Sequence, residues 1–177
     1  IIAPASLRII GRSAFAKCVS LKRVVLNEGL EALGPKEQEC RQMCSGIFQG
    51  SAVEEVVLPS TLKKIESREF QDCKGLKSIA LPDGLEKVGK SSFAGSALEQ
   101  VTVPRGVVEI CDSAFQNCAG LRAVAFAADS QLQRIGASAF AGSGLESFTA
   151  PASLTDISQG AFSRCKQLKR VVLNEGL

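Results

Sequence analysis

The cysteines are the side chains whose type and spacing could support chemistry in this chain, as nucleophiles, metal ligands or disulfide partners. There are seven cysteines among 177 residues, and histidine is absent. No C-x-x-C motif occurs, so neither a zinc site nor a cysteine–histidine nucleophile is indicated. Carboxylates do not gather at one repeated position either, which leaves no acid–base pair. The sequence therefore predicts a protein that is not an enzyme, with no catalytic residue, no metal site and no cofactor.

The elements that position the cysteines belong to a repeated unit. The template L-x-x-I-x-x-x-A-F-x-x-C-x-x-L-x-x-V-x-L-P recurs along the chain at steps of 22 to 25 residues, apart from one step of 32 residues, and LKRVVLNEGL occurs at both 21–30 and 168–177. A repeat of this period predicts a solenoid, here a single array over 1–177 of about seven repeats. One template column holds only phenylalanine: Phe15, Phe48, Phe70, Phe93, Phe115, Phe140 and Phe162. Another is aliphatic: Ile10, Leu33, Ile65, Val88, Ile110, Ile135 and Ile157.

The segment L-x-x-V-x-L of each unit, as at 21–26, 76–81 and 168–173, predicts one strand of a parallel sheet. The named residues point inward and the residues between them point outward, because side chains alternate along a strand. Prolines at the strand ends fit this assignment, since a missing N–H does least harm there. We expect a second short strand near the aliphatic column, with turns and short helical turns elsewhere.

Four cysteines share one template column, in which serine alternates with cysteine: Cys18, Ser51, Cys73, Ser96, Cys118, Ser143 and Cys165. Cysteines of this column are two units apart, about 9–10 Å at the usual strand spacing. A disulfide requires Cα atoms within about 7 Å. We therefore interpret these cysteines as small buried residues that donate weak S–H hydrogen bonds to the backbone. Cys111 stands where other units have glycine, and we expect it near the surface of a turn.

This string of motifs resembles the BspA-like, or Treponema-type, leucine-rich repeats over the whole chain. The resemblance implies a curved, right-handed leucine-rich-repeat solenoid with parallel strands on its concave face. It also implies protein binding, because many members are surface proteins of bacteria and protists and some are adhesins. A cell-surface location follows from the resemblance, whereas a set of mostly unpaired cysteines favours a reducing, intracellular compartment. Both locations remain open.

The step of 32 residues contains an insertion, PKEQECRQMC, at 35–44. Pro35 suits the first turn of a helix, and Glu37 and Arg41 have the spacing of a helical ion pair. We expect a short helix with Cys40, Met43 and Cys44 on one face. This face either contacts a partner or folds back over the solenoid.

The outward residues of the first strand form a candidate binding face on the concave side. The centre of this face is small and neutral, its ends are basic, and the chain has no tyrosine or tryptophan to serve as an anchor. Such a face suits an extended peptide or another protein's surface, and equally suits no ligand. Its residues are Arg23, Val25, Glu55, Val57, Ser78, Ala80, Gln100, Thr102, Ala123, Ala125, Ser147, Thr149, Arg170 and Val172.

Charges alternate in sign along the column that precedes this face: Lys22, Glu54, Lys77, Glu99, Arg122, Glu146 and Lys169. The alternation indicates ion pairs between neighbouring units, which favour the correct register; the other interpretation is a ligand-binding stripe. The net charge of +3 is too small to indicate nucleic acid binding. No apolar run approaches the ~18–20 residues of a membrane span, so we expect no membrane insertion.

Two functions are consistent with these patterns. The first is a protein–protein interaction module, as the repeat architecture and the insertion favour. The second is a structural scaffold or assembly subunit, in which open strand edges contact neighbouring repeats or subunits. The chain begins inside a strand and closes on the first residue of a new unit, so we expect a fragment of a longer array.

Overall fold

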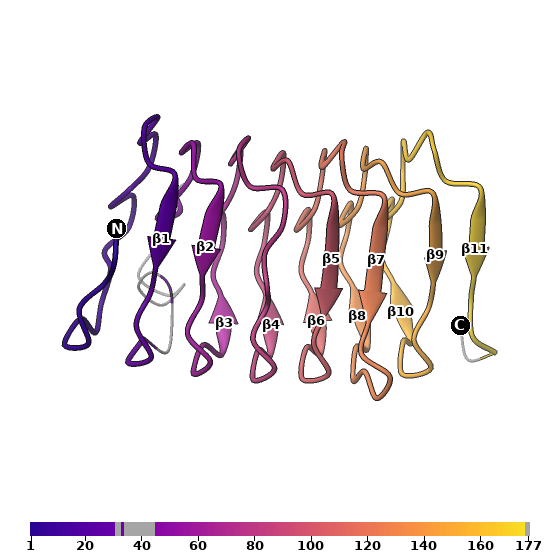
Figure 1. Cartoon of the computed structure of the whole chain (residues 1–177). Coiled ribbons are helices and arrows are strands. Elements are labelled where there is room, and N and C mark those ends of the chain that lie inside the picture. The colour runs from indigo at the N-terminus through magenta and orange to yellow at the C-terminus, as the bar shows by residue number, and fades with distance from the viewer. Residues whose placement is uncertain (31–32, 34–44, 176–177) are drawn as a thin grey trace.

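The computed structural model describes residues 1–30, 33 and 45–175. It shows successive turns of the chain stacked side by side in one row, from the N-terminal to the C-terminal end (Figure 1). We call each turn of the chain a rung. Every rung places its strands and turns beside the equivalent residues of the next rung, so the described residues form the solenoid that the repeat predicts.

Two columns of parallel strands run along the solenoid (Figure 1). The first column contains β1 (Arg23–Val25), β2 (Glu55–Val57), β5 (Gln100–Val103), β7 (Ala123–Phe126), β9 (Ser147–Thr149) and β11 (Arg170–Val172). The second contains β3 (Lys64–Ile65), β4 (Lys87–Val88), β6 (Glu109–Ile110), β8 (Arg134–Ile135) and β10 (Asp156–Ile157). The second column lies at the aliphatic positions, where the sequence predicts a short strand.

The pairing register matches the sequence repeat. Val24 pairs with Val56 and Ile65 with Val88, so template equivalents lie side by side. The second column forms one five-stranded sheet in the order β10-β8-β6-β4-β3, whereas the first column divides into the pairs β1-β2, β5-β7 and β11-β9.

The predicted strand around residues 78–81 is not formed. It carries one β-branched residue, Ile79, where β2 carries two and β5 carries three, and β-branched residues favour strands. The first column is therefore interrupted between β2 and β5.

A third ladder of hydrogen bonds runs through the backbone around the phenylalanines. The N–H groups of Ser91, Phe93 and Gly95 donate to carbonyls of the next rung at 3.0, 2.8 and 2.7 Å. Ser91 and Gly95 lie at φ 55° and 67°, the left-handed region that makes such a tight turn possible. Short helical turns were expected outside the strands, but the described residues have hydrogen-bonded turns there and no helical turn. The reason is that these N–H groups bond to the neighbouring rung and so cannot close a helix.

The core consists of ladders of identical side chains. The seven column phenylalanines stack face to face, with ring centroids of neighbours 5.2 to 5.5 Å apart and planes within 14° of parallel. Phe48, Phe70, Phe93, Phe115 and Phe140 are fully buried. Each buried side chain of this kind contributes about 1.5–3 kcal/mol, so the stack is a principal source of stability. The phenylalanine column of the sequence repeat is therefore one continuous stack in the structure.

The two copies of LKRVVLNEGL make the same contact. The side-chain amide of Asn27 donates to the carbonyls of Pro4 and Leu7, and that of Asn174 donates to the carbonyls of Pro151 and Leu154 at 3.0 and 3.1 Å. Each asparagine thereby ties the end of its strand to the turn of the preceding rung. The duplicated sequence thus corresponds to a duplicated structural connection.

Candidate protein-interaction face

The outward side chains of the first strand column form a continuous surface, which we call the strand face. It contains the residues predicted for the concave binding face, and these are exposed except for Val25, which is half-buried. The register brings them together in rows: Arg23 lies beside Glu55, Gln100 and Thr102 lie beside Ala123 and Ala125, and Val172 lies beside Thr149. The predicted direction of these side chains is confirmed, whereas their role in binding stays a prediction.

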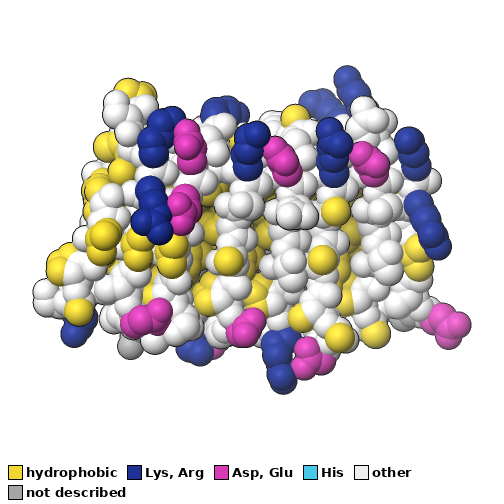
Figure 2. Space-filling model, viewed as in Figure 1, with side chains coloured by type: hydrophobic (Ala, Val, Ile, Leu, Met, Phe, Trp, Pro, Cys, Tyr) yellow, Lys and Arg dark blue, Asp and Glu magenta, His cyan; other side chains and the backbone are white. Residues whose placement is uncertain are grey.

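The middle of the strand face has no charged side chain. We call this part the central section: Ser78, Ala80, Gln100, Thr102, Ala123, Ala125, Ser147 and Thr149. Toward the N-terminal end, the Nε of Arg23 lies 2.7 Å from the Oε2 of Glu55, beside Val57, which is 41% exposed. Figure 2 shows the central section as a pale region below a row of charged side chains. A partner that docks here would contact small polar and apolar groups and experience little net electrostatic field.

Open hollows lie along the central section where strand pairing is interrupted. One, of about 500 Å³, is lined by Ser78, Ile79, Ala80 and Leu81 together with Gln100 and Thr102. Another, of about 400 Å³, is lined by Val124, Ala125 and Phe126 together with Thr149 and Pro151. Ile79, Leu81, Val124 and Phe126 are half-buried, so each hollow has an apolar floor. Because the hollows are open and not enclosed, they suit an extended chain better than a small molecule.

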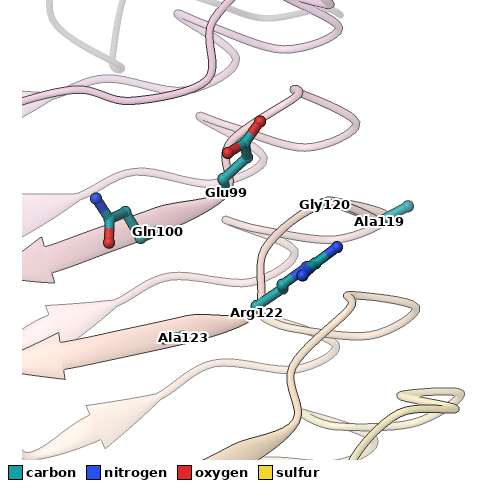
Figure 3. A pocket seen from close by; sticks show the side chains of 6 residues that line it. All are labelled: Glu99, Gln100, Ala119, Gly120, Arg122 and Ala123. Carbon is teal, nitrogen blue, oxygen red and sulfur yellow. The ribbon is translucent and has the colours of Figure 1, made fainter.

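A third hollow, of about 530 Å³, lies at the edge of the strand face and is lined by Glu99, Gln100, Ala119, Gly120, Arg122 and Ala123. Figure 3 shows the Glu99 and Arg122 side chains extending from successive rungs beside Ala119 and Gly120. The hollow is open because Ala119 and Gly120, which line it, have small side chains. This hollow joins the neutral central section to the charged row.

The alternating charges form a row along one edge of the strand face (Figure 2). The Nζ of Lys22 lies 2.6 Å from the Oε1 of Glu54, and the Nζ of Lys77 lies 3.3 Å from the Oε1 of Glu99. All four side chains are more than half exposed, so each pair contributes less than about 1 kcal/mol. The contacts between neighbouring rungs are those expected if the charges favour the register.

Two of the column cysteines, Cys73 and Cys118, are buried hydrogen-bond donors. The Sγ of Cys73 donates to the carbonyl of Phe48 at 3.1 Å, and that of Cys118 donates to the carbonyl of Phe93 at 3.0 Å. Each also lies near a serine of the adjacent rung, Ser51 at 3.7 Å and Ser96 at 3.4 Å. Burial raises the pKa of both thiols to about 11, so they remain protonated and unreactive at neutral pH. Their prediction as structural residues is confirmed, and no disulfide joins any two cysteines of this column.

The prediction for Cys111 is wrong, because this residue is buried at 9% exposure. Its N–H donates to the carbonyl of Val88 at 3.0 Å in the preceding rung. On the other side lies Gly136, where an added Cβ would be 2.7 Å from the Cys111 carbonyl carbon. The absent side chain of Gly136 lets the next rung lie directly over Cys111.

Glu69 is a buried charged residue that the sequence analysis did not single out. Its side chain is 2% exposed, and its Oε2 accepts the N–H of Ile47 at 2.7 Å. Burial is the main cause that raises the pKa of this carboxyl from 4.5 to about 7; Glu66 raises it further, while the Ile47 N–H and Arg12 lower it. The sequence does indicate that Glu69 is unusual, because the residue before the column phenylalanine is small in several other rungs: Ala14, Ser92, Ala114, Ala139 and Ala161.

The predicted contact residues of the insertion, Cys40, Met43 and Cys44, lie outside the described residues, and so does the helix predicted for 35–44. Within the described part, no group of three or more histidine, cysteine, aspartate or glutamate residues could hold a metal ion. No helix among these residues is long and apolar enough to cross a membrane.

Comparison with known families identifies the architecture. The model of the BspA type leucine-rich repeat region, with six copies, matches residues 1–39 and 41–174. The chain belongs to this family. The family suggests a protein-interaction module with protein partners.

Solved structures of bacterial leucine-rich repeat proteins resemble this BspA-type chain. A leucine-rich repeat protein from Bacteroides ovatus is 26% identical with a TM-score of 0.83, and the match covers 97% of this chain and 44% of that one. The pneumococcal vaccine antigen PcpA is 28% identical with a TM-score of 0.66, covering 86% and 36%. A leucine rich cell surface protein from Faecalibacterium prausnitzii, at 24% identity and a TM-score of 0.73, covers 97% and 46% and shares the fold.

The chain thus spans less than half of each of these three proteins. No curated protein gives a significant match to it.

Proposed function

We propose that this BspA-type solenoid is a non-enzymatic protein-binding module whose central section binds an extended segment of another protein. The observation that carries the proposal is the pair of open hollows with apolar floors in an uncharged part of the strand face. An extended segment lying along the central section would pass over both hollows. Gln100, Thr102 and Thr149 line the same hollows and supply hydrogen-bonding groups at their rims.

The composition of the face sets the expected strength of binding. Tryptophan and tyrosine are absent from the chain, and these residues dominate the tightest protein interfaces. Affinity therefore arises from many modest contacts, and we expect a dissociation constant in the micromolar range, about −8 kcal/mol.

The absence of catalysis is part of the proposal. Burial raises the pKa of the Glu69 carboxyl to about 7, but this group is buried and bonded to a backbone N–H. It lines none of the three hollows, so it is not placed to exchange a proton with a bound substrate.

We further propose that the module acts at a cell surface, in the manner of an adhesin. Support comes from the BspA-type family and from the pneumococcal vaccine antigen, which shares 28% identity over 86% of this chain. Secretion of the full-length protein, tested by surface labelling of the producing cells, checks this location. Labelling that reaches the protein only after the cells are lysed contradicts it.

Peptide selection tests the binding face. A phage library of random dodecapeptides is selected on the purified chain, and the affinity of enriched peptides is measured by calorimetry. Thr102→Lys and Ala125→Lys add long charged side chains beside the hollows, and we expect each to weaken binding at least tenfold. Gln159→Lys makes the same addition at an exposed site outside the strand face and serves as the matched control.

Two outcomes would overturn the proposed face. The first is a selected peptide whose affinity is unchanged by Thr102→Lys and Ala125→Lys. The second is a selection in which no peptide binds the unaltered chain better than it binds these variants.

A further inference from the structure

Glu69 contacts the chain a few residues after the insertion at 35–44. Its Oε2 accepts the N–H of Ile47 from the preceding rung at 2.7 Å. In other rungs, the equivalent N–H bonds within its own turn, as from Ala139 to the carbonyl of Gly136 at 3.2 Å and from Ser92 to that of Gly89 at 3.2 Å. Ser45 and Gly46 separate Ile47 from the insertion at 35–44, and here a side chain from the next rung supplies an acceptor.

The backbone around this contact is closely packed against the neighbouring rungs. An added Cβ on Gly46 would lie 2.0 Å from the carbonyl oxygen of Arg68 and 2.5 Å from the Cα of Glu69. The carbonyl of Ile47 accepts the N–H of Phe15 at 2.9 Å, and the N–H of Phe48 donates to the carbonyl of Glu69 at 3.1 Å. Residues 46–48 are therefore held between two rungs, and the Glu69 carboxyl lies within that junction.

Among the described residues, two charged side chains influence the ionisation of Glu69. Glu66, on its own turn, disfavours the ionised form, while Arg12 favours it. On the following rung, the equivalent position is Ser92, which carries no charge. Burial outweighs the other influences and brings the pKa of Glu69 from 4.5 to about 7. The carboxyl group thus gains its charge near neutral pH at a place with little access to water.

We propose that Glu69 is a proton-operated clasp, whose neutral form holds residues 46–48 against the solenoid and whose ionisation loosens this junction. Ionising a carboxyl group that is buried is costly, and local opening to water relieves the cost. This function goes beyond binding at the strand face, because it controls how the chain is fastened next to 35–44.

The sign of the effect follows from proton linkage. The closed junction binds the proton with a pKa of about 7, and an opened junction binds it with the ordinary value of 4.5. Between these values the closed form holds more protons, so it loses stability as pH rises through this window. Below the window and above it, the stability of the junction does not change with pH.

Hydrogen exchange of the Ile47 amide tests the clasp in the intact chain. After correction for the intrinsic pH dependence of exchange, we expect protection of this amide to fall about 25-fold between pH 5.5 and pH 8. The Ala139 amide is the internal control, because its acceptor is a backbone carbonyl. Glu69→Gln retains the acceptor and the size of the side chain but cannot ionise, and we expect its Ile47 protection to be independent of pH.

The proposal is overturned if Ile47 protection does not depend on pH, if Ala139 shows the same fall, or if Glu69→Gln leaves the fall unchanged. Should Glu69→Gln not fold, carbon-13 NMR titration of the Glu69 carboxyl in the unaltered chain decides the matter. A midpoint near pH 7 together with the Ile47 change supports the clasp, and a midpoint near the ordinary pH of a glutamate contradicts it.

Discussion

Replacing Phe115 by alanine tests whether the stacked phenylalanines hold the solenoid together. Phe115 is fully buried and stacks on Phe93 and Phe140, with 5.3 Å between ring centroids on each side. Loss of a buried phenylalanine costs about 3–5 kcal/mol, and each lost ring contact adds about 0.5–1.5 kcal/mol. We therefore expect Phe115→Ala to lower the free energy of unfolding by about 4–8 kcal/mol.

Phe15→Ala is the matched comparison. Phe15 is half-buried and stacks on Phe48 alone among the described rings, at 5.5 Å. With less buried surface and one stacking neighbour, this variant should lose only about 1–3 kcal/mol. Urea unfolding followed by far-ultraviolet circular dichroism measures both, since the chain lacks tryptophan and tyrosine. Equal losses at the two positions, or a loss below about 2 kcal/mol for Phe115→Ala, would refute the reasoning.

Three further predictions concern single contacts. Iodoacetamide at pH 8 should modify Cys118, whose pKa is raised to about 11 by burial, at least about tenfold more slowly than the half-buried Cys165; peptide mass mapping showing equal rates would contradict this. Gly89→Ala should lower the free energy of unfolding by about 1–3 kcal/mol, because the added Cβ would lie 2.5 Å from a backbone oxygen. Gly84→Ala is the control, since no atom would lie closer than 3.4 Å to its Cβ, and it should leave the thermal unfolding of the chain nearly unchanged. Lys22→Gln should change the free energy of unfolding by less than about 1 kcal/mol, since its ion pair is exposed, and a larger loss in urea would show that the charged row is a main source of stability.

The sequence was sufficient for everything that each rung repeats. The spacing of Phe93, Phe115 and Phe140 predicted one shared environment, and these rings stack within 3° of parallel. The alternation of cysteine and serine likewise predicted thiol donors, and Cys118 bonds to a backbone carbonyl. These features follow from the template, because identical residues at one period occupy identical places in a stack.

The sequence was insufficient where one rung departs from the template, because the outcome depends on what the neighbouring rung places opposite. Cys111 is buried because the facing residue is Gly136. Glu69 is bonded because the Ile47 N–H of the preceding rung points at it. The strand predicted at 78–81 is missing because this segment has a single β-branched residue, Ile79, although it fits the shared motif.

For the candidate site, alternation along the strand predicted which side chains point outward, and residues such as Thr102 and Ala125 are exposed. The hollows could not be predicted in this way. They arise where pairing between rungs is interrupted, which leaves Ile79 and Phe126 half-buried. Periodicity gives the direction of a side chain but not the depth of the surface beside it.

The three ladders give the molecule a distinctive response to force. Their hydrogen bonds connect successive rungs, as between Phe93 and Ala114, and therefore lie along the length of the row. Tension applied along that length would break first the rung boundary with the fewest such bonds, and would leave the other boundaries intact. The chain should therefore extend rung by rung, so that it could absorb mechanical work without a single abrupt rupture.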